Sequence, residues 1–536
     1  MKKKNLKEKI SALSRDKRFL HGSFSVALTA MVIVCVIALN ILFSALSAHF
    51  NWYADMTPDE VYSITEESVQ AIQNVQGVKY KILFCQEADR VRSSQLGLYV
   101  YQCAQTYAER TDKVEVEYLD LSEPSAYAAY SKTTSLTKDS VIIASFDAQS
   151  GDLIAFRALT YLGFYVADSD VTDSTDIFAF DGEYRFTATM LGLATGRPYA
   201  YFTDGHGEEN TEDNALYNLF VDAGYEVRIL DLKKAKLPLD ASEEATLKQD
   251  AEKWQAYLDD QNQLQRNGVI IINNPKKDFY AYKEQNEDGS IAVNETSFVE
   301  RYVREYDGNL MLFADPTANQ LPKLQDLAST YQMNFDTTTG AYLTDTGSSL
   351  SQDGKVLLAT QNQDAVVKNL LGEKMSTLRA VTPYATKLRI PDETVNEDGG
   401  YTLAPDGMSG TFFPLLRSGA DDSMTLGMFA INHIKTGGER YHTYVMVCGS
   451  PGFASDAYLG SNAYANRDIL YTVLFRMKNQ KNEYVIPSDL NYRLLADESL
   501  DITTHAANVW TAVIVTVLPL CVTVAGIVVY VRRKHL

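Results

Sequence analysis

Two long apolar runs, one near each end of the sequence, limit most strongly what this chain can fold into. Residues 24–46 read FSVALTAMVIVCVIALNILFSAL and residues 509–531 read VWTAVIVTVLPLCVTVAGIVVYV, and neither run contains a charged side chain. A helix needs roughly 20 such residues to cross the hydrocarbon core of a bilayer. Trp52, Trp510 and Tyr530 lie at the edges of the runs, where aromatic rings favour the headgroup layer. The sequence therefore predicts two transmembrane helices.

Basic residues predict the orientation of these helices, because Lys and Arg remain preferentially on the cytoplasmic side of a membrane. Eight basic residues lie in the tail of residues 1–23, and Arg532, Arg533 and Lys534 lie in the tail of residues 532–536. We therefore expect a cell-membrane protein with both termini in the cytoplasm and its central part outside. A cleaved signal peptide is the competing interpretation of the first run, but the run is too long and no small-residue cleavage site follows it cleanly.

The part of the chain between the two runs is strongly acidic. The whole chain has a formal net charge of -20. Because the two basic tails carry +6 and +3, the remainder carries -29. An extracytoplasmic domain of this charge repels nucleic acid and anionic lipid. We therefore expect no nucleic-acid partner.

Cysteines do not organise this fold. Cys85, Cys103 and Cys448 lie outside the apolar runs and show neither CxxC nor zinc-ligand spacing. A bridge between Cys85 and Cys103 is possible, but two small buried thiols are the favoured interpretation, because free cysteine packs well in a core.

Strand and helix patterns alternate through the roughly 460 residues between the runs, a length that suggests two or three domains. Residues 47–190 are expected to form a first, membrane-proximal α/β domain. Its predicted strands are Val78–Phe84, Val114–Leu121 and Ser140–Ser145, with a helix at 96–110. A capping box is predicted at Ser63–Glu66, which read SITE before an apolar helix.

Residues 191–480 are expected to form a second domain, a doubly wound α/β domain with insertions. A strand within Arg197–Glu209, the helix NALYNLFVDAG and the strand YEVRILDL make a predicted βαβ unit, and further strands are expected at 267–275, 310–316 and 444–448. Glu243–Arg266 is predicted to be a surface helix with Ala251, Trp254 and Leu258 on one stripe. Residues 338–430 give weak strand signals, residues 391–410 are expected to be an irregular loop, and residues 481–508 a linker.

The sharpest chemical pattern is TDGHGEE, in which Asp204, His206 and Glu208 alternate after a predicted strand. Ligands bind at the carboxyl ends of strands in doubly wound sheets, so the three side chains are a candidate ligand or partner site. Metal or catalytic chemistry would need further convergent ligands, which no motif supplies. The structural alternative is favoured: Gly205 and Gly207 form a tight turn, while the two carboxylates cap the following helix.

Two weaker candidates lie at the same predicted sheet edge. Asp315 follows one strand, and Ser450 lies in the Gly-rich turn GSPGFASD, which could receive an anion on its backbone amides. That turn lacks the Lys and Ser/Thr of a nucleotide-binding loop, no Walker A sequence occurs, and no GxSxG is present. We therefore expect no cofactor, no bound metal and no enzymatic activity.

Several phrases together resemble the GldG family, the auxiliary membrane proteins of gliding-motility-type ABC transporters. They are DMTPDEVYSIT after the first run, YFTDGHGEE, FVERYVREYDGNLMLFADP, GSPGFASD followed by NRD, and PSDLNYRLLADESLD before the second run. The resemblance implies a bacterial protein with a separate ABC-type ATPase and a multi-span permease as partners. It also implies a thioredoxin-like first domain without paired redox cysteines and a glutamine-amidotransferase-like second domain without catalysis.

The expected function is therefore that of a non-catalytic auxiliary subunit whose outer domain engages cargo or couples to the permease. Two alternatives remain open. One is an envelope enzyme, a metal-dependent hydrolase that uses the Asp204, His206 and Glu208 loop. The other is a structural outer domain that assembles with itself. The sequence does not identify the cargo.

Overall fold

A computed structural model gives the fold of most of the chain between the two apolar runs. It describes residues 61–130, 136–167, 177–210, 214–280, 294–337, 342–372, 374–389, 394–395, 401–403, 408–434, 438 and 440–495, and residues 31, 34, 37 and 38. The chain divides into two compact units, Met1–Glu60 and Val61–Leu536. All the strands given below belong to the second unit.

The two predicted transmembrane helices lie almost entirely outside the described residues. None of the helices within the described ranges is both long enough and apolar enough to span a bilayer. Met31, Val34, Ile37 and Ala38 are described, and all four are helical and exposed. The two membrane spans therefore stay a prediction.

The first sheet has the strand order β2-β1-β3-β4. Strands β1 and β2 are parallel, whereas β3 is antiparallel to both β1 and β4. Their bounds are β1 Val78–Phe84, β2 Val114–Tyr118, β3 Ser140–Asp147 and β4 Leu153–Thr160. The predicted α/β pattern of this region is thereby confirmed.

One face of this sheet carries most of its core, because side chains alternate between the two faces of a strand. Tyr80, Ile82 and Val141 point to the face covered by helices α3 (Glu66–Gln73), α5 (Gln95–Arg110) and α7 (Gly182–Ala194). Leu83, Cys85 and Ile142 point to the opposite face, where a smaller cluster includes Leu119 and Tyr130. Short elements complete the region: α4 Ala88–Ser93, α6 Pro124–Tyr127, η1 Tyr161–Phe164, β5 Tyr165–Ala167 and β6 Ile177–Phe180.

The predicted capping box at Ser63–Glu66 is wrong. Helix α3 begins at Glu66, and its N-cap is Thr65, whose hydroxyl accepts a hydrogen bond from the Ser68 amide. The Ser63 hydroxyl instead receives a hydrogen bond from Arg493, 430 residues away in the sequence. The local capping pattern failed here because the Ser63 hydroxyl, which the pattern assigns to the helix N-terminus, takes part in a tertiary contact instead.

The second sheet contains a parallel core in the order β8-β7-β9-β10-β19. The bounds are β7 Tyr199–Asp204, β8 Glu226–Asp231, β9 Val269–Asn273, β10 Asn309–Phe313 and β19 Arg440–Cys448. In chain order the five strands lie 2-1-3-4-5, an order that doubly wound sheets use. The predicted strand positions in this region are confirmed.

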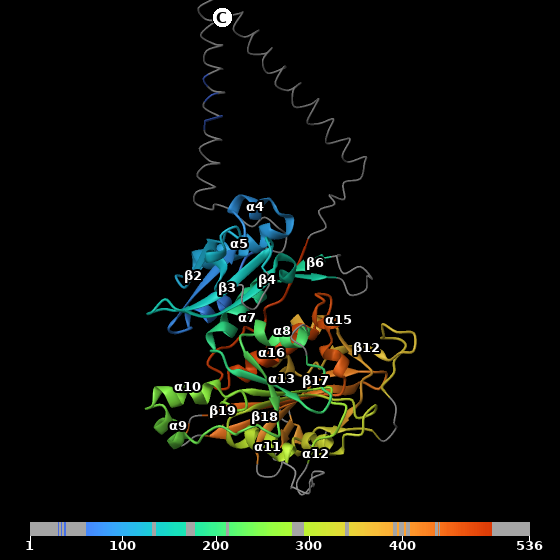
Figure 1. Cartoon of the computed structure of the whole chain (residues 1–536). Coiled ribbons are helices and arrows are strands. Elements are labelled where there is room, and N and C mark those ends of the chain that lie inside the picture. The colour runs from blue at the N-terminus through green and yellow to red at the C-terminus, as the bar shows by residue number, and fades with distance from the viewer. Residues whose placement is uncertain are drawn as a thin grey trace, which may run out of the picture. The chain divides into compact units, whose positions relative to one another are not determined.

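Helices cover both faces of this parallel core (Figure 1), as its alternating side chains require. Phe202, Ile271 and Met446 pack in the cluster that includes α8 (Ala215–Asp222) and α16 (Asn466–Lys478). Tyr201, Ile270 and Val447 pack in the cluster that includes α11 (Glu295–Glu305) and α12 (Pro322–Thr330).

Antiparallel strands extend the parallel core, and most of them were not predicted. The bounds are β12 Val356–Gln361, β13 Ala380–Pro383, β17 Gly410–Ser418 and β18 Ser423–Ile434, and β18 joins β19. The first nine residues of β18 are buried, so both faces of this strand are covered; its alternation is limited to SMTL, and the following residues GMFAI contain no polar side chain. The predicted loop at 391–410 is also partly wrong, because it contains the paired strands β15 (Thr394–Val395) and β16 (Tyr401–Leu403).

The predicted surface helix at Glu243–Arg266 is present as α10 (Ala251–Asp259), preceded by α9 (Ala241–Leu247). Trp254 and Leu258 are only half-buried. The remaining elements are short: β11 Asn334–Phe335, α13 Ala365–Leu371, α14 Lys374–Thr377, β14 Leu388–Arg389, η3 Pro451–Ala454, α15 Asp456–Leu459 and β20 Arg493–Leu494.

Cys85 and Cys103 are free and buried, as predicted, and Cys448 is free and buried as well. Burial raises the pKa of Cys85 to about 11 and that of Cys448 to about 12, because the thiolate would lose its hydration. These thiols therefore pack as small hydrophobic side chains at neutral pH.

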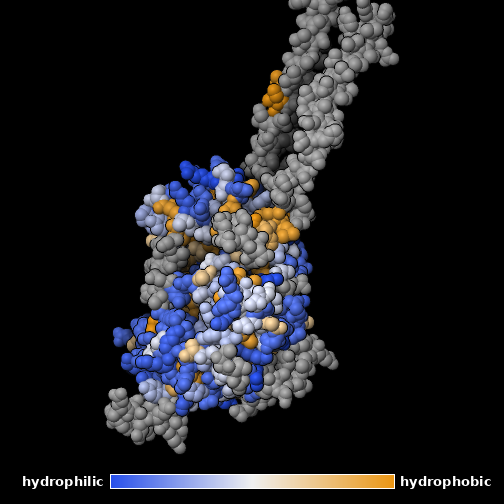
Figure 2. Space-filling view, turned by 90° about the vertical axis from the view of Figure 1, so that its right-hand side faces the viewer, coloured by the Kyte–Doolittle hydropathy of each residue, from blue (hydrophilic) through white to orange (hydrophobic). Residues whose placement is uncertain are grey.

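Hydrophobic surface is distributed unevenly over the described residues. On the face shown in Figure 2, hydrophobic residues gather in the upper part, and the lower part is mostly hydrophilic. Leu162 in η1 and Leu494 in β20 are among the exposed large hydrophobic residues.

Truncation of Phe202 tests the packing of α8 on the second sheet. Phe202 is 1% exposed and packs against Phe220 with ring centroids 5.2 Å apart. We expect Phe202→Ala to lower the free energy of unfolding by about 3–5 kcal/mol, because it leaves a cavity in the core. Ile229→Ala, on the neighbouring strand and 46% exposed, should change it by less than about 0.5 kcal/mol. Denaturant unfolding of the purified full-length protein measures both, and equal effects would contradict the described packing.

Candidate functional site

The TDGHGEE loop follows β7 at the carboxyl edge of the parallel strands. Gly205 and Gly207 have φ angles of 123° and 77°, a region that favours glycine. The loop is fastened to the end of β9, since Asn273 donates from Nδ2 to the Glu209 carbonyl at 2.8 Å and the Glu209 amide donates to the Asn273 carbonyl at 3.2 Å. The chain therefore bends after β7 at the sheet edge beside β9, where the strand order reverses, but the predicted tight strand-to-helix turn is wrong, because α8 begins only at Ala215.

His206 is held between two carboxylates. Its Nδ1 lies 3.3 Å from Glu208 Oε1, and its Nε2 lies 3.0 Å from Glu295 Oε2. The imidazole also stacks on Phe279 at a centroid distance of 4.0 Å, and His206 is only 3% exposed. The ring therefore joins the β7 loop to the first residue of α11.

Burial opposes a charge on the His206 ring, but the hydrogen bonds and negative charges of Glu208 and Glu295 outweigh it and raise the pKa of His206 to about 9. Burial likewise opposes ionisation of Glu208, but its hydrogen bond with His206 lowers the pKa of that carboxyl. The histidine is therefore an imidazolium at neutral pH, and with Glu208 and Glu295 it forms an enclosed triad.

The predicted convergence of Asp204, His206 and Glu208 is only partly present. Glu208 contacts His206, whereas Asp204 is exposed. The predicted cap is also absent: α8 begins only at Ala215, and its N-cap is Asn214. Among the described residues, no group of three or more His, Cys, Asp and Glu side chains is arranged to hold a metal ion. The partner that sequence analysis missed is Glu295, which no local motif connects to His206.

Asp315 and Ser450 lie at the same edge of the sheet, and each has a structural role in its own loop. Asp315 accepts hydrogen bonds from the amides of Thr317 and Ala318 and from the Tyr342 hydroxyl. Ser450 is fully buried and donates to the Pro383 carbonyl at 2.6 Å. The Asp315 carboxylate therefore closes a turn, and the Ser450 hydroxyl joins two loops.

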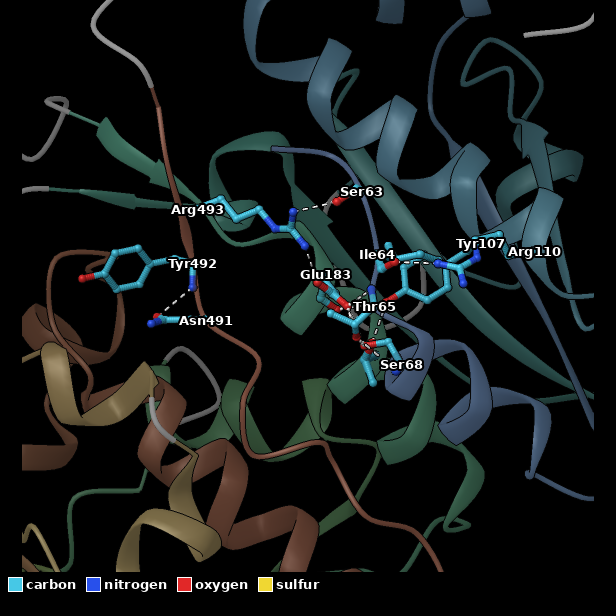
Figure 3. A network of polar contacts seen from close by, with 11 residues as sticks. Ser63, Ile64, Thr65, Ser68, Tyr107, Arg110, Glu183, Asn491, Tyr492 and Arg493 are labelled. Carbon is cyan, nitrogen blue, oxygen red and sulfur yellow. Dashed lines mark hydrogen bonds and ion pairs between the residues drawn. The ribbon is translucent and has the colours of Figure 1, made fainter. Parts of the chain in front are cut away.

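A second polar centre, which sequence analysis missed, surrounds Glu183 on α7 (Figure 3). Glu183 Oε1 accepts hydrogen bonds from the Thr65 amide at 2.6 Å, the Thr65 hydroxyl at 2.6 Å and the Ser68 hydroxyl at 2.8 Å. Its Oε2 forms an ion pair with Arg493 at 3.1 Å, and Arg493 also donates to the Ser63 hydroxyl at 2.6 Å. One carboxylate therefore joins the chain just after the first apolar run to the chain before the second.

Arg493, the C-terminal member of this centre, lies on the short strand β20. Strand β20 pairs antiparallel with β6, and the Leu495 amide donates to the Phe178 carbonyl at 2.9 Å. Tyr492 packs edge-on against Phe178 with ring centroids 5.4 Å apart. The segment predicted as a linker is thus attached to the folded body as far as residue 495.

Helix α7 also contacts α16, which packs on the larger sheet, through Tyr184 and Arg185, the two residues that follow Glu183. Arg185 forms an ion pair with Asp468 on α16, where NH2 lies 2.9 Å from Oδ2, and its Nε lies 3.0 Å from Asp181 Oδ2. Tyr184 and Thr472 hydroxyls are 3.1 Å apart. All three charged groups are buried. Helix α7 therefore connects the Glu183 centre to the core of the larger sheet.

Comparison with known proteins gives no relative: no family model matches the chain, and no curated protein matches it.

The His206 triad predicts a pH-dependent contribution to stability. Because folding raises the pKa of His206 to about 9, its contribution is fully present below pH about 6.5 and is lost as the pH rises through about 9. We expect His206→Gln to lower the free energy of unfolding by about 2 kcal/mol at pH 6 and by less at pH 10. Denaturant unfolding of both proteins across this range measures the difference, and a constant difference would refute the charged triad.

Removal of the Glu183 carboxylate should strongly destabilise the protein. We expect Glu183→Ala to lower the free energy of unfolding by about 3–5 kcal/mol. The substitution leaves Arg493 without its buried partner, and it leaves the Thr65 amide and the Thr65 and Ser68 hydroxyls without their acceptor. The control is Glu66→Ala, which removes the exposed ion pair with Arg110 and should cost less than about 1 kcal/mol. If urea unfolding showed the same loss of unfolding free energy for both variants, the Glu183 centre would not have the structural role described.

Proposed function

We propose that this chain is a two-pass membrane protein that serves as a non-catalytic auxiliary subunit of an ABC transport system. In this proposal both tails lie in the cytoplasm, and residues 47–508 lie outside it. The partners are a separate ATPase and a multi-span permease. The outer part couples to the permease or engages its cargo.

The observation that carries the proposal is the convergence of both membrane-proximal segments on Glu183. Ser63 lies 17 residues after the first apolar run, and Arg493 lies 16 residues before the second. Both side chains belong to the same hydrogen-bonded centre as the Glu183 carboxylate. A displacement of either membrane helix would therefore act on α7, and through Arg185 and Asp468 on the second domain.

The family resemblance and the strand orders support the same proposal. The order β2-β1-β3-β4, with a parallel β1 and β2, is consistent with a thioredoxin-like first domain, and the order β8-β7-β9-β10-β19 is consistent with a doubly wound, glutamine-amidotransferase-like second domain. The enclosed ion pairs of His206 favour a structural role for the loop over catalysis.

Co-purification tests the partner assignment. A tagged full-length chain, extracted from its native membrane in mild detergent, should recover an ABC-type ATPase and a multi-span permease. The control is a tagged variant with residues 24–46 replaced by an unrelated transmembrane segment, which should recover less permease if this helix packs on it. Recovery of neither partner by the native chain would contradict the proposal.

A further inference from the structure

The α9–α10 hairpin is a well-formed element that adds little to the core. Helix α9 begins with a complete capping box, in which Asp240 accepts from the Glu243 amide and Glu243 accepts from the Asp240 amide. None of the residues of α10 is buried. The hairpin is therefore held in a fixed shape while most of its surface remains accessible.

Arg228 on β8 fastens the hairpin to the large sheet. Its guanidinium donates to the carbonyls of Leu258 at 2.8 Å and Asp260 at 3.2 Å, and it lies 4.2 Å from the centre of the Tyr199 ring. Trp254 and Tyr257 stack with ring centroids 5.2 Å apart within α10. These contacts fix the hairpin before any partner binds, which reduces the entropic cost of binding.

A groove of about 500 Å³ lies between α9 and α10. Its apolar lining consists of Leu239, Leu247 and Tyr257, and its polar lining consists of Ser242, Glu243, Thr246, Asp250 and Lys253. A groove that offers both apolar and polar side chains can receive one face of an amphipathic helix.

The charge around this groove identifies the kind of partner that fits it. Between Asp240 and Asp260 there are seven acidic and two basic side chains, which gives a net charge of -5 over 21 residues. We infer that the α9–α10 groove is a docking surface for an amphipathic helix of a partner protein that carries Lys or Arg beside its apolar face. Leu247 and Tyr257 receive the apolar side chains, and Glu243 attracts the basic ones. This inference does not depend on the transport function proposed above.

Peptide binding to the full-length protein in detergent tests this docking surface. The probe is a fluorescein-labelled peptide of about 16 residues with Leu at helical spacings of three and four and Lys on both flanks. Fluorescence anisotropy should show saturable binding that weakens with added salt. A peptide of the same pattern with Glu in place of Lys should bind at least about tenfold more weakly.

Three variants locate the site. Leu247→Ala should raise the Kd of the Lys peptide about fivefold, and Glu243→Gln, which preserves the capping box, should raise it about two- to threefold. Glu252→Gln is the matched control, because it makes the same change on α10 outside the groove lining, and it should leave the Kd unchanged. No saturable binding up to about 1 mM, equal binding of the Glu peptide, or unchanged binding to Leu247→Ala would each overturn the inference.

Discussion

The hydrogen-bonded side chain of Glu183 provides the interaction on which the arrangement of the rest of the chain depends. It accepts three hydrogen bonds from the start of the folded region and forms an ion pair with Arg493 near its end. A buried charge of this kind is stable only while its partners remain in place. Both segments that adjoin the predicted membrane helices are therefore held at one point, although they lie 430 residues apart.

Helix α7 passes this constraint to the larger sheet. Glu183 binds the segments at the two ends of the folded region, and Arg185, two residues later, is paired with Asp468 in the core. Burial opposes the charge of Arg185, but the two carboxylates beside it raise its pKa, so that the pair remains ionised. Helix α7 therefore links the Glu183 centre directly to the core of the larger sheet.

Sequence patterns predicted the local structure well and the contacts between distant segments poorly. Val78–Phe84 and the βαβ unit after Arg197 were predicted because their apolar periodicity is local. Glu295 lies 89 residues from His206, and nothing in TDGHGEE indicates it. Glu183 was missed for the same reason: DGEYRF has no motif, and its role is defined only by Thr65, Ser68 and Arg493. Strand β18 was missed because its alternation is limited to SMTL and the residues GMFAI that follow have no polar side chain, as is common in a strand buried on both faces.

Hydrogen exchange in a reconstituted complex would test most directly whether both segments are coupled through Glu183. The full-length chain would be measured with the proposed ATPase and permease partners, with and without a non-hydrolysable ATP analogue. We expect protection at residues 61–68 and 491–495 to change together in the native chain. In Glu183→Ala the two changes should separate, whereas Glu66→Ala should behave as the native chain does. Independent changes in the native chain would contradict the account.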